Sequence, residues 1–170
     1  FNSLPDRSFG EPAFILNAVS SQGLTVSYSA APSGIVSISG STVTILATGD
    51  VTITATQAGD ANFEAAVSVP QSLKVKPAAV TPAQITLTPP ASLEYDKTQK
   101  AFTASSSVTA VTNFVLRYKP AGDVSAGNTF APTDAGDYTV TAEVWQANYT
   151  GTGSTNFTIT RRPLTVTANA

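Results

Sequence analysis

The chain contains neither cysteine nor histidine. Without Cys it has no disulfide framework, no thiol nucleophile and no thiolate metal site. Without His it lacks the commonest general base and a frequent metal ligand. Charged residues make up only 12% of the chain, about half of the usual ~25%. We therefore expect a protein that is not an enzyme and that holds neither a cofactor nor a metal.

Strong charge and long apolar runs are also absent. A net charge of −2 offers no basic field for nucleic acid or for an anionic membrane surface. No apolar run approaches the ~18 residues that a spanning helix needs, so direct membrane insertion is not expected. No signal peptide is visible. The sequence opens on Phe1 and stops at Ala170 within a strand pattern, so we expect it to be a piece of a longer protein.

What is present is a series of short alternating segments. Apolar residues form 42% of the chain, which suffices for β-sandwich cores. Segments of period two, spaced 8–12 residues apart with Gly, Pro and Ser between them, predict an all-β fold. No stretch shows sustained helical periodicity. The expected strands cover residues 13–19, 24–30, 35–39, 42–46, 51–55, 72–76, 84–88, 93–96, 101–104, 112–119, 128–131, 134–145 and 154–160.

The segments fall into two similar halves. Residues 77–83 contain Pro77 and Pro82, which favour extended backbone and predict a short, semi-stiff linker. We expect one domain over residues 1–76 and a second over residues 84–160. Residues 161–170 contain Leu164-Thr165-Val166-Thr167, which repeats the pattern of Ile85-Thr86-Leu87-Thr88. This last segment is predicted to begin a further repeat or to form a terminal strand.

An internal repeat supports the division. The stretch Gly49–Ala55 matches Gly136–Ala142, and Ala61-Asn62-Phe63 matches Ala147-Asn148-Tyr149 at nearly the same offset. Pro12-Ala13-Phe14 stands where Lys100-Ala101-Phe102 does. A period of this kind indicates an array of modules.

These residues also carry a resemblance to known families. Residues 1–76 resemble bacterial immunoglobulin-like repeats of large surface and secreted proteins, on Tyr28, Val36 and residues 40–55. Residues 84–160 resemble the repeats termed MBG, on Tyr95-Asp96 and on residues 131–138 and 147–151. The resemblance implies two tandem immunoglobulin-like β-sandwich domains without catalytic residues.

The segment Asp134-x-Gly136-x-Tyr138 is also similar to the tyrosine corner of immunoglobulin sandwiches. In that corner, the Tyr hydroxyl bonds back to the backbone a few residues upstream. The first half has Val51 at the Tyr position. The most distinctive motif of the chain therefore has a structural explanation.

The expected function follows from this resemblance. We expect a structural spacer or stalk module of a large bacterial protein, located at the cell surface or outside the cell, with neighbouring repeats as its partners. One alternative is an adhesin that binds a glycan or a host or cell-surface protein. Another is an accessory module of a polysaccharide-degrading enzyme.

Three aromatic residues are the candidates for ligand binding. Trp145, the only Trp, follows the inward-facing set out of phase, and we expect Tyr149, Tyr118 and Lys119 to lie near it. An exposed aromatic platform for a sugar is one interpretation. Packing of Trp145 at the end of the sandwich or against a neighbouring module is the more common role of such a residue.

Three further hypotheses concern charged residues. Asp60–Asn62 and Asp134–Asp137 have some calcium-loop character, but turn chemistry explains both, and position 71, where an EF-hand needs Glu, is Gln. Lys97 or Lys100 near Asp96, or Lys74 near Glu64, could form an isopeptide crosslink with an Asn. Glu143, Glu94 and Asp96 are the only candidates for a paired-carboxylate hydrolase, and no cleft is evident for them.

Overall fold

A computed structural model describes residues 1–166. Apart from a single 3-10 turn, Pro82–Gln84, its regular structure consists of β-strands, which confirms the all-β prediction. The chain divides into two compact units, Phe1–Ala78 and Ala79–Ala170. The border falls within the segment 77–83 that was expected to link two domains.

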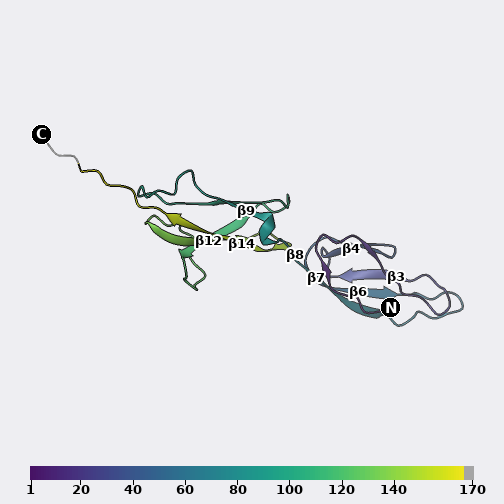
Figure 1. Ribbon diagram of the computed structural model, residues 1–170. Helices are drawn as coiled ribbons and strands as arrows, with labels where there is room; N and C mark the ends of the chain where they lie inside the picture. The colour runs from purple at the N-terminus through teal and green to yellow at the C-terminus, as the bar shows by residue number, and fades with distance from the viewer. Residues whose placement is uncertain (167–170) are drawn as a thin grey trace. The chain divides into compact units, whose positions relative to one another are not determined.

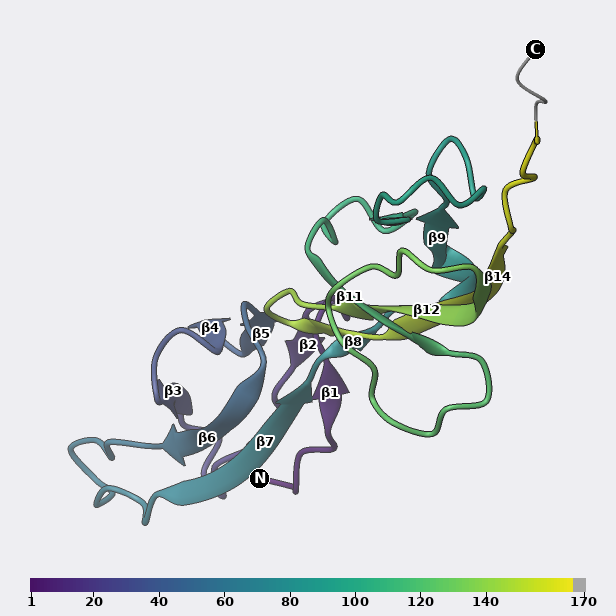
Figure 2. The ribbon, with the colours of Figure 1, turned by 90° about the vertical axis from the view of Figure 1, so that its left-hand side faces the viewer.

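The first unit contains two sheets. The larger has the order β1-β7-β6-β3 and the smaller the order β2-β5-β4. Figure 2 shows β1, β7 and β6 side by side. The strands are β1 (Arg7–Ser8), β2 (Phe14–Ile15), β3 (Ser27–Ala31), β4 (Val36–Ser39), β5 (Thr42–Ile45), β6 (Gly49–Thr56) and β7 (Val69–Lys76).

Alternation along the central strand β6 builds the core of this unit. Val51, Ile53 and Ala55 are buried, while the residues between them face outward. This follows from the period of two along a strand, which sends successive side chains to opposite faces. Leu73 and Val75 of β7 and Val43 of β5 pack into the same core.

The second unit is built around a three-stranded antiparallel sheet of order β11-β12-β14. Two smaller pairs, β9 with β10 and β8 with β13, accompany it. Figure 1 labels β8, β9, β12 and β14 of this unit. The elements are β8 (Ala78–Ala79), the 3-10 turn η1 (Pro82–Gln84), β9 (Ile85–Thr88), β10 (Thr103–Ser106), β11 (Phe114–Pro120), β12 (Gly136–Val144), β13 (Tyr149–Thr150) and β14 (Thr152–Ile159).

Strand β12 divides its buried residues between two adjoining clusters. Val140 packs with Phe102, Tyr118, Phe157 and Ile159. Ala142 and Val144 belong to the other cluster, whose remaining buried members are Val80, Ile85 and Val111. The predicted strand 134–145 is thus the central strand of the unit, and it begins at Gly136.

Several expected strands are shorter than the sequence pattern predicts. The segment 13–19 contracts to Phe14–Ile15, because the backbone N–H of Ala18 donates to the hydroxyl of Tyr28, at 2.8 Å, instead of to a neighbouring strand. The segments 93–96 and 128–131 each form only one isolated bridge, at Glu94 and Asn128. The alternation of apolar and polar residues indicates which face of a sheet each side chain occupies. The length of a strand depends instead on whether a neighbouring strand of matching length pairs with it.

The segments at both ends of the second unit also differ from expectation. Val80, within the expected linker, is 3% exposed, and its N–H donates to the carbonyl of Thr150 at 2.7 Å. The predicted linker, residues 77–83, therefore includes Val80, which belongs to the core of the second unit. After β14, residues 161–166 form no strand. The rest of the predicted terminal segment, 167–170, lies outside the described residues.

Candidate functional site

The corner that begins β12 has the hydrogen bond that a tyrosine corner implies. The hydroxyl of Tyr138 donates to the backbone carbonyl of Asp134 at 3.2 Å. The Tyr138 ring stacks on Phe157, with centroids 5.7 Å apart and an interplanar angle of 27°. The side chain of Asp137 accepts a hydrogen bond from the Thr158 hydroxyl at 2.6 Å. The first contact closes the corner itself, and the other two anchor it to β14, so its role is structural.

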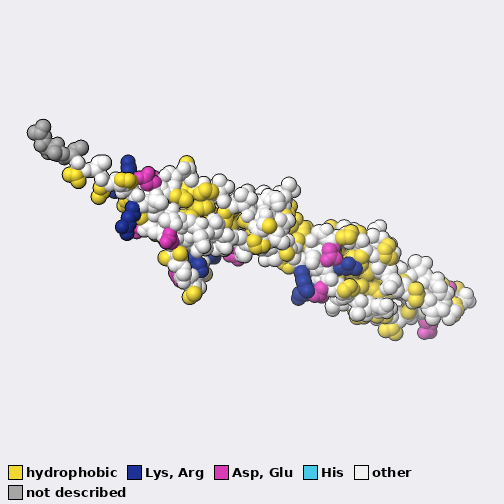
Figure 3. Space-filling view, viewed as in Figure 1, with side chains coloured by type: hydrophobic (Ala, Val, Ile, Leu, Met, Phe, Trp, Pro, Cys, Tyr) yellow, Lys and Arg dark blue, Asp and Glu magenta, His cyan; other side chains and the backbone are white. Residues whose placement is uncertain are grey.

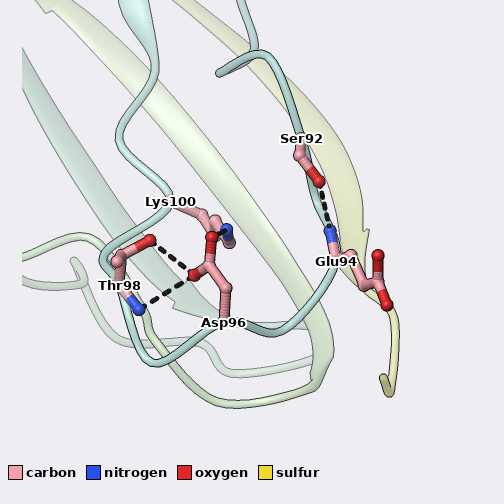
Figure 4. A network of polar contacts seen from close by, with 5 residues as sticks. All are labelled: Ser92, Glu94, Asp96, Thr98 and Lys100. Carbon is pink, nitrogen blue, oxygen red and sulfur yellow. Dashed lines mark hydrogen bonds and ion pairs between the residues drawn. The ribbon is translucent and has the colours of Figure 1, made fainter. Parts of the chain in front are cut away.

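Next to this corner lies a polar network on the loop between β9 and β10 (Figure 4). The ammonium of Lys100 lies 2.8 Å from Oδ2 of Asp96. Oδ1 of Asp96 accepts hydrogen bonds from the backbone N–H of Thr98, at 2.9 Å, and from its hydroxyl, at 2.5 Å. A separate contact in the same loop joins the hydroxyl of Ser92 to the N–H of Glu94.

The two members of the ion pair have unequal access to solvent. The side chain of Lys100 is 3% exposed, whereas that of Asp96 is 42% exposed. The Lys100 ammonium and the two donors of Thr98 hold the pKa of Asp96 far below its usual value. Lys is almost never fully buried unless it is paired. Sequence reasoning placed Lys100 near Asp96 but had no signal for its burial.

This arrangement bears on the crosslink hypothesis. The ammonium of Lys100 pairs with the carboxylate of Asp96, and the backbone N–H of Lys100 donates to the carbonyl of Pro132. Lys74, another lysine of the hypothesis, pairs with Asp50 at 3.3 Å rather than with Glu64. Lys100 and Lys74 thus serve in ion pairs in the structure, and an isopeptide bond stays a prediction that intact mass can test.

A hollow of about 790 Å³ opens beside the network. Its wall combines Asp96 and Lys97 with Asp134 of the corner and with residues 161–165. The volume is in the range of ligand pockets, but the wall carries charges of both signs and includes Leu164, which is 96% exposed. The hollow offers polar contacts without the buried apolar lining that fixes a small molecule.

The three aromatic candidates do not form one platform. Trp145 is 69% exposed, beside the buried Val144, as its phase in the strand predicts. Tyr149 is half-buried and packs against the cluster around Val80. Tyr118 is 4% exposed, and its hydroxyl accepts a hydrogen bond from the N–H of Phe102 at 2.9 Å. The inclusion of Tyr118 in a surface site was therefore wrong, because the inward face of β11 places its ring in the core.

The acidic candidates also have structural partners. Oδ1 of Asp60 accepts hydrogen bonds from the N–H groups of Asn62 and Phe63, at 2.8 and 3.0 Å, and so closes a turn. Glu143 lies 3.9 Å from Arg117 across the strand pair β11–β12. Residues 1–166 contain no cluster of three or more acidic side chains placed to hold a metal ion.

The surface of each unit has few charges. On the face in Figure 3, charged side chains are scattered among neutral and apolar ones. Within the described part of the chain, no helix has the length and apolar character that crossing a bilayer demands.

Comparison with known proteins bears on the second unit. No curated protein matches the chain. The family model described as MBG domain matches residues 83–163, which confirms the resemblance predicted for residues 84–160. A match to this model indicates a repeat module of a large surface protein. Residues 83–163, which carry the Tyr138 corner and the Asp96–Lys100 pair, are thus identified as an MBG domain.

Proposed function

We propose that the chain consists of two tandem immunoglobulin-like β-sandwich modules that act as a structural spacer. They would belong to a large bacterial protein at the cell surface or outside the cell, and would hold other domains at a distance without catalysing a reaction. The neighbouring repeats of the same protein would be their partners. The MBG match to the second unit is the observation that carries this proposal.

The shared arrangement of the two units supports tandem modules of one kind. In the first unit β6 lies between β3 and β7, and in the second β12 lies between β11 and β14, with every pair antiparallel. The registers correspond as well: Gly49 is opposite Val75, and Gly136 is opposite Ile159. The repeated sequence therefore occupies the central strand of a sheet in both units.

Parallel pairing with the last strand segment of each unit supports a mechanical role. In the first unit β1 runs parallel to β7, with Arg7 opposite Val75. In the second, Glu94 forms a parallel bridge with Thr160, flanked by two backbone hydrogen bonds of 2.9 and 3.0 Å. In the first unit, where β1 and β7 are the first and last strands, a pull on the two ends loads the hydrogen bonds of this pair in shear, so they must break together.

Small-angle scattering on the whole chain tests the spacer role. A single compact body of this length would have a radius of gyration of about 15 Å. Two modules held apart would give a clearly larger value and an extended distance distribution. A radius near 15 Å that does not change with salt would mean that the units collapse onto each other, and the spacer proposal would lose its basis.

The exposure of Trp145 favours one alternative, a module that binds a glycan or a surface protein. Exposed aromatic rings suit contacts with sugars because they combine a flat apolar face with a polar edge. A glycan array probed with the chain and with Trp145→Ala tests this function. Glycan binding by the original chain that is lost in the variant would support this function. The absence of binding by both proteins would rule it out.

A further inference from the structure

Strand β11 is at the edge of the three-stranded sheet of the second unit, where β12 is its neighbour. In an antiparallel ladder, successive residues of an edge strand direct their backbone groups alternately toward the neighbour and away from it. The carbonyl of Asn113 accepts the N–H of Trp145 at 2.9 Å, so the odd-numbered residues of β11 bond to β12. The N–H and C=O groups of the even-numbered residues therefore point to the open side of the sheet.

The chain itself closes both ends of this edge. At one end, Tyr118 and Asn128 exchange two backbone hydrogen bonds, of 2.7 and 3.0 Å. At the other end, the N–H of Thr112 donates to the side chain of Gln146 at 3.4 Å. Between these points, at Phe114–Leu116, no segment of residues 1–166 pairs with the outward backbone groups. A short stretch of the edge is thus left open.

The loop that follows β11 turns away from this stretch. In the register set by the Tyr118–Asn128 bridge, the N–H of Phe130 would face Leu116. It donates instead to the side chain of Asn128 at 3.0 Å. Two residues later, the carbonyl of Pro132 accepts the N–H of Lys100, so the loop continues toward the segment before β10. The opening of the edge is therefore set by hydrogen bonds within the second unit itself.

The side chains along the edge divide between the two faces of the sheet. Leu116 packs into the core, whereas Val115 and Arg117 are on the outer face. Trp145, directly after β12, continues this outer face and is 69% exposed. The guanidinium of Arg117 lies 3.9 Å from Glu143, and both side chains are about half exposed. Such a surface pair contributes little, so Arg117 is free to take a further partner.

We propose that the open edge of β11 pairs antiparallel with the same edge of a second copy of the chain. The two-fold axis passes between Val115 of each copy. On each side of it, Phe114 of one copy and Leu116 of the other exchange their backbone hydrogen bonds. Exposed strand edges are templates for pairing of this kind. The two three-stranded sheets then form one continuous sheet.

The outer faces of the two copies are complementary in this register. Val115 is opposite Val115 of the partner subunit, and Arg117 is opposite Asn113 of the partner subunit, so no like charges meet. Beyond that Asn, on the same row, is Trp145 of the partner subunit. The two backbone positions are two strand spacings apart, about 10 Å, which a guanidinium and an indole ring bridge together. A cation over an indole face is a favourable contact, and it specifies a second copy as the partner.

The proposed contact joins identical surfaces, so it is isologous and closes as a dimer. Only residues 114–116 of each copy contribute backbone hydrogen bonds, and small interfaces of this kind give weak, reversible association. The contact would join neighbouring copies of the chain side by side through their second units.

Sedimentation velocity at concentrations up to 1 mM tests the pairing and should show monomer and dimer but nothing larger. Val115→Lys should stay monomeric at concentrations at least tenfold higher, because two ammonium groups would then be directly opposite each other at the axis. Within one copy the new side chain faces Glu143, which suits the fold. An original chain that is monomeric at 1 mM would overturn the proposal.

The matched control is Thr152→Lys. Thr152 is exposed and is opposite Glu143 on its other side, in β14, so this variant adds the same charge beside the same carboxylate but away from the open edge. It should dimerise as the original chain does. Equal dimerisation of Val115→Lys and Thr152→Lys would overturn the proposed edge.

Introduced thiols locate the axis, because the chain has no Cys of its own. Directly opposite residues of a non-hydrogen-bonded antiparallel pair have Cα atoms about 4.5 Å apart, within the range of about 4.4–6.8 Å that a disulfide spans. Under mild oxidation, Val115→Cys should form a covalent dimer at least tenfold faster than Thr152→Cys. Equal rates would overturn the proposed register.

A double-mutant cycle tests the contact between Arg117 and Trp145 of the partner subunit. Arg117→Gln and Trp145→Ala should each weaken dimerisation about tenfold, since the symmetric dimer contains the contact twice. The double variant should be no weaker than either single variant, because both remove the same contact. Additive losses would overturn the register. Scattering on Val115→Lys measures the shape of one copy, so the spacer role and the edge pairing can fail independently.

Discussion

The hydroxyl of Tyr138 reaches back four residues and donates to the carbonyl of Asp134 at 3.2 Å. The same ring stacks on Phe157 of the neighbouring strand β14. One side chain therefore ties the entry of the central strand both to its own corner and to the core. Two substitutions separate these contributions.

Tyr138→Phe should destabilise the second unit by about 0.5–1.5 kcal/mol, the typical net value of one hydrogen bond. Tyr138→Ala should cost about 2–5 kcal/mol, because it also removes the ring that packs on Phe157. Urea unfolding monitored by circular dichroism gives both values. A cost below about 0.5 kcal/mol for Tyr138→Ala, the range of surface substitutions, would mean that the corner does not anchor the unit.

A second tyrosine makes a more deeply buried contact. Tyr118→Phe removes the hydroxyl that accepts the Phe102 N–H and leaves a buried donor without a partner, so we expect a loss of about 1–3 kcal/mol. Tyr28→Phe is the matched control, because the Tyr28 hydroxyl accepts the N–H of Ala18 in a partly buried site that water can reach. Equal costs for the two variants would contradict the role assigned to burial.

The burial of Tyr118 also predicts that the stability of the folded chain depends on pH in the alkaline range. Desolvation raises the pKa of its hydroxyl above the ordinary value of 10.0. Above that value the unfolded chain releases the proton while the folded chain keeps it, so the folded state binds more protons and stability falls as pH rises. Tyr118→Phe should flatten the fall in unfolding midpoint between pH 9 and pH 11. If the unfolding midpoint of Tyr118→Phe falls with pH as steeply as that of the original chain, Tyr118 is not the source of the fall.

The Asp96–Lys100 pair predicts that the stability of the folded chain depends on pH in the acid range. Because the folded-state pKa of Asp96 is depressed, its contribution is present above the unfolded value of about 3.9 and is lost as pH falls below it. Asp96→Asn should lower the melting temperature at pH 7 and reduce its change between pH 5 and pH 2. The double variant Asp96→Asn/Lys100→Met should recover part of the loss, because no unpaired ammonium is then buried.

The matched control for this pair is Asp50→Asn. Asp50 and Lys74 form an ion pair whose side chains are 77% and 55% exposed, and exposed pairs contribute little. Its melting temperature should stay close to that of the original chain. A loss equal to that of Asp96→Asn would show that burial of Lys100 has no special importance.

The fit of Val80 against the β13–β14 turn gives a further prediction. A Cβ on Gly151 would lie 2.2 Å from the carbonyl oxygen of Val80, too close for any atom, so Gly151→Ala must displace this segment. We expect a loss of about 1–3 kcal/mol, as for other overpacked sites. Ser154→Ala, at an exposed position of β14, is the control and should change stability by less than about 0.5 kcal/mol.

Much of the fold could be predicted from local pattern. The alternation in residues 51–55 and 138–144 sends side chains to opposite faces of a strand, and the glycine before each run marks where the strand begins. The corner motif likewise depends on residues only four positions apart. Features of this kind are encoded locally, so they can be read without knowing what packs against them.

The candidate site was harder to predict because its parts come together only through long-range packing. Tyr118 and Trp145 are both aromatic residues of apparent strands, yet one is in the core and the other at the surface. For Tyr118 the deciding contact is with Phe102, sixteen residues away. The burial of Lys100 depends in the same way on how the segment 96–102 lies against the sheet.

The sequence by itself determined the all-β class, the repeat of the corner strand and the MBG character of the second half, because periodicity and turn chemistry act between near neighbours. Only the tertiary structure decided that Val80 belongs to a core rather than to a linker, that Lys100 is buried, and that part of the edge of β11 is open. Each of these depends on which strands become neighbours, and that choice is made by packing between residues far apart in the chain.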